Sequence, residues 1–211
     1  MAFDMGFNFR ATAGYVTDNI HYAVPALGEA YPHTYTNGDG QSINAGTNGS
    51  WQAPLDRNAG NDSRIAGMYY QSNDGSGPTF QVDLSSGSAP GAGTYTVDFA
   101  AGDPGGTARP EDFKLFDNAT LLIDGTNGGA GIDTGGSNAF IDATLSVVAG
   151  GAAWNGVTVN KTFATTTVLF QIAIDAIGNL TCFSHFRLTL QAAATGWGPL
   201  LSHARNRSVV A

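Results

Sequence analysis

Apolar and polar residues alternate in two short segments near the middle of the chain. Residues 79–84 read TFQVDL, and residues 94–99 read TYTVDF. Successive side chains of a strand point to opposite faces of a sheet, so this alternation predicts two strands that each bury one face. The residues between them, SSGSAPGAG, are small or turn-forming. The pattern predicts a β-hairpin that carries Asp83 and Asp98 on its outer face, where they are either solvated or paired across strands.

Similar short segments along the rest of the chain predict further strands. They are residues 2–9, 67–71, 113–116, 120–123, 140–148, 157–163, 168–174 and 180–190, the last of which is open to a break. Helical periodicity is weak and confined to residues 21–31, where Pro25 and Gly28 argue against a helix. Many short strands separated by turn residues are typical of a sandwich. The fold class that we expect is all-β.

Two segments lack a clear pattern and are rich in Asn, Gly, Asp and Ser. They are residues 37–74 and residues 124–138. A loop as long as the first is uncommon inside a compact domain. We therefore expect that it either contributes to function or contains an unrecognised strand.

The composition limits the classes of partner. The chain has 211 residues, which is enough for one domain with a full core. Its formal net charge is −8, and Lys114 and Lys161 are its two lysines. A protein that binds nucleic acid needs a concentrated basic surface. No nucleic-acid partner is therefore expected.

The N-terminal residues suggest where the chain is made. They contain no basic region followed by a continuous apolar segment, so neither a signal peptide nor a membrane-spanning helix is expected. The single cysteine, Cys182, excludes an intrachain disulfide. His185 lies three positions further on and points to the opposite face of a strand, so Cys182 is predicted to be a buried, inert thiol. The chain is expected to be made in a cytosol.

The chain contains no recognisable catalytic motif. G-x-S-x-G, HExxH and CxxC are all absent, and the four histidines are scattered. Glu29 and Glu111 are the only glutamates, and most aspartates occupy predicted turns, where the carboxylate bonds nearby backbone amides. We therefore predict that the protein is not an enzyme.

Two loops rich in side-chain oxygen atoms could bind a metal ion. Asp56 and Asp62 flank one such loop, and Asp124 and Asp133 flank another. Ca²⁺ prefers carboxylate and carbonyl oxygens, although neither loop matches a defined calcium motif. No cofactor is predicted, and a structural calcium ion at these aspartates is the alternative.

The C-terminal residues differ from the rest of the chain. A spacer of small residues follows Leu190, and the last ten residues contain Arg205 and Arg207 without any acidic residue. We predict a β domain over residues 1–191 and a docking arm over residues 192–211, with Trp197, Arg205 and Arg207 as its contact residues. A frayed terminus is the alternative.

The order of several motifs resembles the malectin-like and galactose-binding-like domains that often accompany polysaccharide-degrading enzymes. The motifs are FDMG at residues 3–6, GYVTD at 14–18, LDR at 55–57, DSRIAG at 62–67, FQVDLSSG at 80–87, TYTVDFAAGD at 94–103, LLIDG at 121–125, AFIDATLSV at 139–147, VTVNKTF at 157–163 and FRLTL at 186–190. The resemblance implies a non-catalytic jelly roll of two antiparallel sheets. It also implies that loops present aromatic rings to a sugar, and Trp51, Tyr69 and Tyr70 are the candidates by position. Tyr69 or Tyr70 as a core residue is the alternative.

The composition of the chain favours a class of protein other than a secreted carbohydrate-binding module. A single β domain that is poor in lysine and made in a cytosol is typical of tailed-phage particles, where jelly rolls are frequent. The first hypothesis is therefore a virion subunit (a capsid decoration, head fibre or tail component) whose partners are other virion proteins or further copies of itself. The second hypothesis is a free-standing glycan-binding module that acts with polysaccharide-degrading enzymes.

Overall fold

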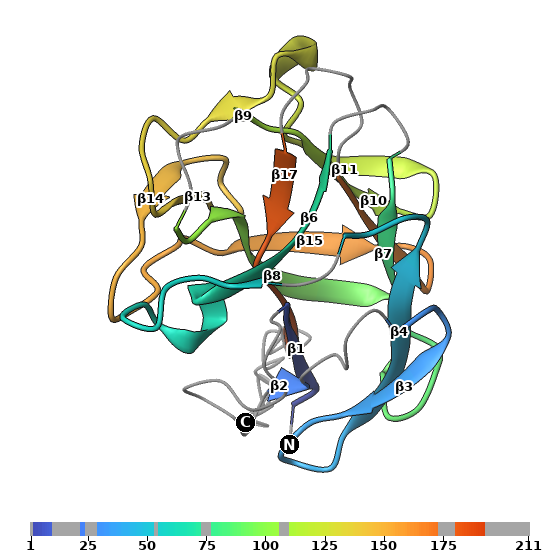
Figure 1. Cartoon of the computed structure of the whole chain (residues 1–211). Coiled ribbons are helices and arrows are strands. Elements are labelled where there is room, and N and C mark those ends of the chain that lie inside the picture. Colours follow the sequence, from blue (N-terminus) through green and yellow to red (C-terminus); the bar gives the residue numbers. More distant parts are fainter. Residues whose placement is uncertain are drawn as a thin grey trace, which may run out of the picture.

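The computed structural model describes residues 2–9, 22–23, 29–52, 55–72, 77–105, 110–172 and 180–192. These residues form two main sheets (Figure 1). Sheet A has the order β14 (Val147–Ala149), β13 (Ala139–Ile141), β8 (Gly93–Asp103), β18 (His185–Leu190), β1 (Asp4–Asn8) and β2 (Tyr22–Ala23), and β15 (Val159–Phe163) also pairs with β8. Sheet B has the order β11 (Thr120–Asp124), β10 (Phe113–Asp117), β16 (Thr167–Ile172), β7 (Thr79–Asp83), β4 (Ser42–Asn48) and β3 (His33–Thr36).

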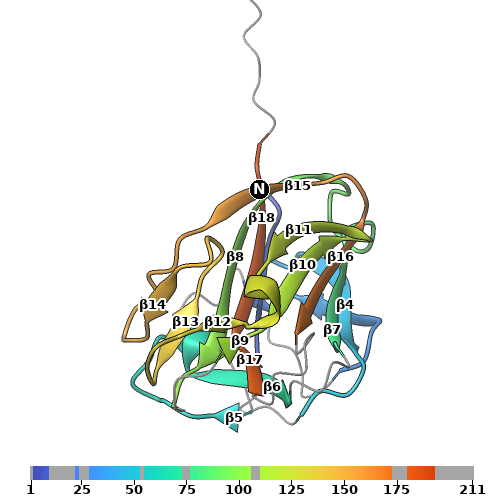
Figure 2. The ribbon, with the colours of Figure 1, turned by 90° about the horizontal axis from the view of Figure 1, so that it is seen from above.

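Smaller elements close the ends of this sandwich. They are a sheet of β17 (Leu180–Phe183), β6 (Gly67–Ser72) and β5 (Leu55–Asp56), a pair of β12 (Ile132–Asp133) and β9 (Pro110–Glu111), and the short 3₁₀ helices η1 (Ser63–Ile65) and η2 (Asn127–Gly129). Figure 2 shows β8 and β18 on one side and β10, β16 and β7 on the other. From β7 onward the chain passes between the sheets, with β8 in sheet A, β10 in sheet B, β13 in sheet A, β16 in sheet B and β18 in sheet A. The expected two-sheet antiparallel β-sandwich of the jelly-roll kind is confirmed.

The predicted hairpin is wrong, although both of its strands exist. β7 pairs with β16 and β4 in sheet B, whereas β8 pairs with β18, β15 and β13 in sheet A. Asp83 and Asp98 therefore belong to different sheets and do not face each other. Alternation specifies that each strand buries one face, but it does not specify the partner strand. Here the two strands bury their apolar faces against one core from opposite sides.

Two further expectations need correction. Residues 140–148 do not form one strand, because a turn at residues 142–146 separates β13 from β14. The irregular region after residue 37 contains an unrecognised strand, β4, whose sequence SINAGTN has too few apolar residues to be seen as one. The predicted break in the last strand is confirmed at Ser184, between β17 and β18.

Aromatic rings from both sheets fill the core. Phe170 of β16 stacks on Phe183 of β17 with 4.0 Å between ring centroids, and it also stacks on Phe113 of β10 at 5.5 Å. Phe99 of β8 meets Phe170 and Phe113 edge-on at 5.2 and 5.3 Å. All four rings are fully buried. Phe170 therefore lies where strands of both sheets meet.

The outer face of sheet A carries a buried polar network, so of the two expected surroundings, solvent or a cross-strand partner, the second holds for Asp98. This residue is only 7% exposed. Its Oδ1 accepts a hydrogen bond from Trp154 Nε1 (3.1 Å), and its Oδ2 lies 3.0 Å from His185 Nε2. Asp62, the N-cap of η1, accepts hydrogen bonds from the backbone N–H of Trp154 (3.1 Å) and from the Arg64 guanidinium (2.7 Å). The loop around Trp154 thus covers a face that alternation alone marks as outward.

We predict that Phe170→Ala lowers the free energy of unfolding by about 3–5 kcal/mol, because it leaves a cavity among stacked rings. The neighbouring Leu169 is half-buried on the outer face of sheet B. Leu169→Ala is the matched control and should cost less than about 1.5 kcal/mol. Urea unfolding of both variants measures the difference. Equal losses would contradict the placement of Phe170 in a shared core.

A second prediction concerns pH. Burial alone would raise the pKa of Asp98, but attraction to His185 and hydrogen bonds from His185 and Trp154 outweigh it, so the pKa lies below its ordinary value. Such a carboxyl stabilises the fold above its unfolded-state pKa of about 3.9, and this contribution disappears as the pH falls through the folded-state pKa. We predict that the free energy of unfolding falls from about pH 5 toward pH 3.

The Asp98→Asn variant should lose part of this pH dependence in urea unfolding. Asp62→Asn serves as a second variant, because burial would raise the pKa of Asp62 as well and hydrogen bonds from Arg64 again lower it. A pH slope identical to that of the unmodified chain in both variants would refute the assignment.

Candidate functional site

One edge of the sandwich is only partly closed. In β15 the side chains of Val159, Lys161 and Phe163 point between the two sheets, and Phe163 is buried in the core. Lys161 reaches across this edge and donates a hydrogen bond from Nζ to the Leu122 carbonyl of β11 (2.9 Å). A polar side chain thus replaces core packing at the edge, and a hollow remains beside it.

The hollow has two adjoining parts, which we call the edge cleft. The first part, of about 350 Å³, is lined by Asp124, Asn127, Ile132, Asp133 and Leu145. The second part, of about 440 Å³, shares Asp124 and Leu145 with the first and ends at Lys161. Both volumes lie in the usual range of small-molecule sites, which is roughly 300–1,000 Å³.

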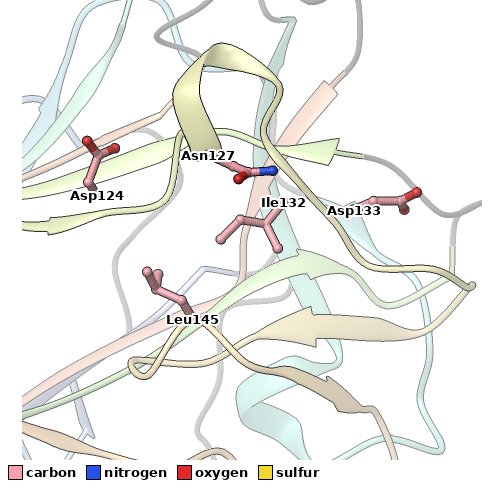
Figure 3. A pocket seen from close by; sticks show the side chains of 5 residues that line it. All are labelled: Asp124, Asn127, Ile132, Asp133 and Leu145. Atoms are coloured by element: carbon pink, nitrogen blue, oxygen red, sulfur yellow. The ribbon is translucent and has the colours of Figure 1, made fainter.

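Figure 3 shows how the side chains of the first part are arranged. Ile132 and Leu145 point toward each other in the middle, and Asn127 lies beside Ile132. Asp124 and Asp133 lie at opposite ends of the hollow. The cleft therefore has an apolar middle, with one carboxylate at each end of its rim and that of Asp133 directed away from Ile132.

Asp124 is an ionised, oriented acceptor. Its Oδ1 accepts hydrogen bonds from the Thr126 hydroxyl (2.6 Å) and from the Thr126 backbone N–H (3.0 Å). The hydrogen bond from the Thr126 hydroxyl is the main cause that holds the pKa of Asp124 below its usual value, and attraction to Lys114 adds to it. Both bonds end on Oδ1, and among the described residues no donor bonds Oδ2, which remains available to a ligand.

Asp133 and Asn127 are held in the same way by local bonds. Asp133 Oδ1 accepts from the Gly135 backbone N–H (2.8 Å), and Asn127 Nδ2 donates to the Gly131 carbonyl (3.0 Å). Asn127 Oδ1 and the second carboxylate oxygen of Asp133 are thus fixed in direction without being used in these bonds. Little side-chain entropy is left to lose when a ligand binds.

Leu145 forms the opposite wall in a strained conformation. Its φ of +65° lies in the left-handed region, which a branched apolar residue rarely adopts. The fully buried Asp142 holds this turn in place. Its Oδ1 accepts hydrogen bonds from the backbone N–H groups of Thr144 (2.9 Å) and Ser146 (3.1 Å). Its Oδ2 accepts one from the backbone N–H of Val157 (2.8 Å). Backbone strain held by surrounding bonds is frequent at ligand sites.

Sequence reasoning missed this wall because residues 140–148 were expected to be one strand. The signal that would have revealed it is the order Asp-Ala-Thr-Leu-Ser from residue 142. An aspartate followed two residues later by Thr is the pattern of an Asx turn. Asp124 and Asp133, at the two ends of the cleft, are recognisable in the sequence, but as candidate calcium ligands.

The three aromatic candidates do not line the edge cleft. Tyr69 is 1% exposed and packs edge-on against Phe9 at 5.2 Å, so it is a core residue, which was the stated alternative. Trp51 is half-buried, lies parallel to Phe9 at 6.5 Å, and donates from Nε1 to the Thr79 carbonyl (3.2 Å). Tyr70 is half-buried on the other face of β6. A role of Trp51 or Tyr70 in sugar stacking stays a prediction.

The four calcium candidates lie in three places. Asp62 is engaged with Arg64 and Trp154, and Asp56 is exposed on β5. Asp124 and Asp133 lie at opposite ends of the cleft (Figure 3). No group of three His, Cys, Asp or Glu side chains able to hold a metal ion occurs within the described ranges. Calcium binding stays a prediction.

Other groups of chemical interest have structural partners. The buried Glu111 accepts a hydrogen bond from the backbone N–H of Cys182 (2.7 Å), and Cys182 is buried as expected. Trp197, Arg205 and Arg207 of the predicted docking arm lie outside the described residues. In the described part of the chain, no helix is long and apolar enough to cross a membrane.

Comparisons with known proteins give weak similarities. No family model matches the chain, and no curated protein matches it. An isomalto-dextranase of Arthrobacter globiformis T6 complexed with panose is 13% identical over 70% of this chain and 22% of its own, with a TM-score of 0.35. A family 35 carbohydrate-binding module of Clostridium thermocellum is 17% identical over 77% of this chain and 100% of its own, with a TM-score of 0.35.

A cycloisomaltooligosaccharide glucanotransferase of Paenibacillus sp. complexed with cycloisomaltoheptaose is 16% identical over 80% of this chain and 20% of its own, with a TM-score of 0.32. The chain thus spans about a fifth of the length of each of the two enzymes. TM-scores of this size do not establish a shared fold, so the architecture described above rests on the strand pairing alone.

The strained turn generates a prediction. Asn tolerates the left-handed conformation, so Leu145→Asn should keep or raise the free energy of unfolding, by up to about 1 kcal/mol. The same change removes the apolar contact opposite Ile132. Urea unfolding measures the first effect. A loss of more than about 1 kcal/mol would contradict the strain argument, because it would show that the Leu145 side chain stabilises the turn.

Proposed function

We propose that this chain is a non-enzymatic carbohydrate-binding module and that a sugar binds in the edge cleft. The observation that carries the proposal is the arrangement in Figure 3, where oriented oxygen acceptors stand at both ends of an apolar middle. A saccharide ring presents hydroxyls at its rim and C–H groups on its faces. The same alternation of polar and apolar groups occurs across the cleft.

The polar groups match the hydrogen-bonding needs of hydroxyls. Asp124 and Asp133 accept hydrogen bonds, the Asn127 amide adds a further acceptor, and the Lys161 ammonium donates from the second part of the cleft. Hydrogen bonds to charged groups are the stronger ones and contribute roughly 1.5–3 kcal/mol each. The side chains are already held by local bonds, which lowers the entropic cost of binding.

The apolar groups explain how a ring is held without an aromatic platform. Ile132 and Leu145 face each other, so a ring placed between them contacts apolar carbon atoms on both faces. The resemblance of the sequence motifs to malectin-like and galactose-binding-like domains supports the same ligand class. The virion-subunit hypothesis stays a prediction from composition, since no feature of the described residues favours it.

The proposal predicts binding of neutral oligosaccharides to the full chain. Isothermal titration with gluco-, xylo-, manno- and galacto-trisaccharides is the measurement. For a trisaccharide that binds, Asp124→Asn should weaken the affinity about tenfold or more, because the neutral amide donor Nδ2 replaces the charged acceptor Oδ2. Asn in this place still accepts the hydrogen bonds of Thr126, so the loop should keep its shape.

Asp83→Asn is the matched control, since Asp83 lies on β7 of sheet B and its Oδ1 accepts from the Ser85 backbone N–H (2.9 Å) in a comparable turn. This variant should bind as the unmodified chain does. The proposal fails if none of the trisaccharides binds at millimolar concentration, or if Asp124→Asn binds with unchanged affinity.

A further inference from the structure

A second hollow lies on the other side of β15, where β8 begins and β18 ends. Its volume is about 540 Å³, larger than either part of the edge cleft. We call it the strand-end pocket, and its lining includes Pro90, Thr94, Asn160, Leu190 and Gln191. β15 separates the two hollows, because its side chains alternate: Val159 and Lys161 line the edge cleft, and Asn160 lines the strand-end pocket.

The lining of the strand-end pocket carries no charged side chain. Its polar groups are hydroxyls and carboxamides of β8, of β15 and of Gln191, the residue that follows β18, and β8 lies between β15 and β18. Each such group contains both a donor and an acceptor. A sugar hydroxyl likewise donates and accepts, whereas a carboxylate, sulfate or ammonium group would find no opposite charge here.

Cross-strand hydrogen bonds hold these groups in a ladder. Thr94 Oγ1 lies 2.9 Å from Thr162 Oγ1, and Thr96 Oγ1 donates to Asn160 Oδ1 at 2.9 Å. Gln191 Nε2 donates to Thr96 Oγ1, which links β18 to the same ladder. The Asn160 oxygen is engaged in this way, so its Nδ2 is the group that the ladder offers to a ligand.

Apolar surface completes the pocket. Pro90 is exposed on the segment that leads into β8, and Leu190 is half-buried at the end of β18. The Tyr95 hydroxyl donates to the Gly91 carbonyl (2.6 Å) and thereby fixes the segment that carries Pro90. A rigid proline ring and a leucine beside a ladder of hydroxyls and amides form the kind of mixed lining that small polar ligands need.

We propose that the strand-end pocket is a second carbohydrate site, which takes an uncharged saccharide unit. This inference shares only the ligand class with the proposed function, because no residue lines both hollows. Two sites on opposite sides of one strand would let a single chain hold two sugar units at once.

The test is a ¹H–¹⁵N NMR titration of the full chain with the neutral gluco-, xylo-, manno- and galacto-trisaccharides, followed by the same titration with their uronic-acid counterparts. We expect the backbone amides of Thr94, Asn160 and Gln191 to shift with the neutral sugars. Their response to the charged sugars should be at least tenfold weaker. Asn160→Asp is isosteric but replaces the free donor by an acceptor and adds a charge, so it should weaken the neutral-sugar response at least tenfold.

Thr94→Val is a second variant that removes the hydroxyl without changing the shape of the side chain. The amides of Asp124 and Leu145 report on the edge cleft in the same spectra. Shifts at the edge cleft without shifts at Thr94, Asn160 and Gln191 would overturn the second site and leave the proposed function standing. The opposite result would support the strand-end pocket and refute the edge cleft, and absence of shifts at both would refute both.

Discussion

The two sheets share one aromatic core. Where apolar side chains do not fill the space between the sheets, a hollow opens at the surface. In the middle of the sandwich, packed aromatic rings hold the strands of both sheets together. They are the rings of Phe99, Phe113, Phe170 and Phe183. At the edge between β11 and β15, Lys161 bridges the two sheets through the hydrogen bond of its ammonium group to the Leu122 carbonyl. The edge cleft is the space that this polar closure leaves open.

Buried aspartates then give the loops over this core their shape. Asp142 accepts hydrogen bonds from the backbone N–H groups of Thr144, Ser146 and Val157. These bonds fix the turn that contains Leu145. Asp117 does the same for Ala164 (2.7 Å) and Thr165 (3.1 Å) before β16. A carboxylate that satisfies several backbone donors removes the cost of burying them and fixes a loop at the same time. Asp117 and Asp142 therefore have structural roles, whereas Asp124 and Asp133, which line the cleft, are exposed.

The sequence predicts the positions of the strands well, but it does not predict which strands pair with each other. Alternation at residues 79–84 and 94–99 locates β7 and β8 because burial of one face is a local property of each segment. It cannot show that they lie in opposite sheets, because pairing depends on contacts with distant strands such as β16 and β18. The same limit explains Asp98, whose outward position is visible in the sequence but whose cover by Trp154 is not. In the cleft, Asp124 and Asp133 are recognisable as loop oxygens, whereas Leu145 becomes recognisable only once the turn at Asp142 is known.

A crystal structure of the full chain with a neutral trisaccharide would show directly whether the sugar occupies the edge cleft. We expect electron density for a sugar ring between Ile132 and Leu145, with a hydroxyl within hydrogen-bond distance of Asp124 Oδ2. Density for the sugar only at Trp51 or Tyr70, with the edge cleft filled by water, would contradict it.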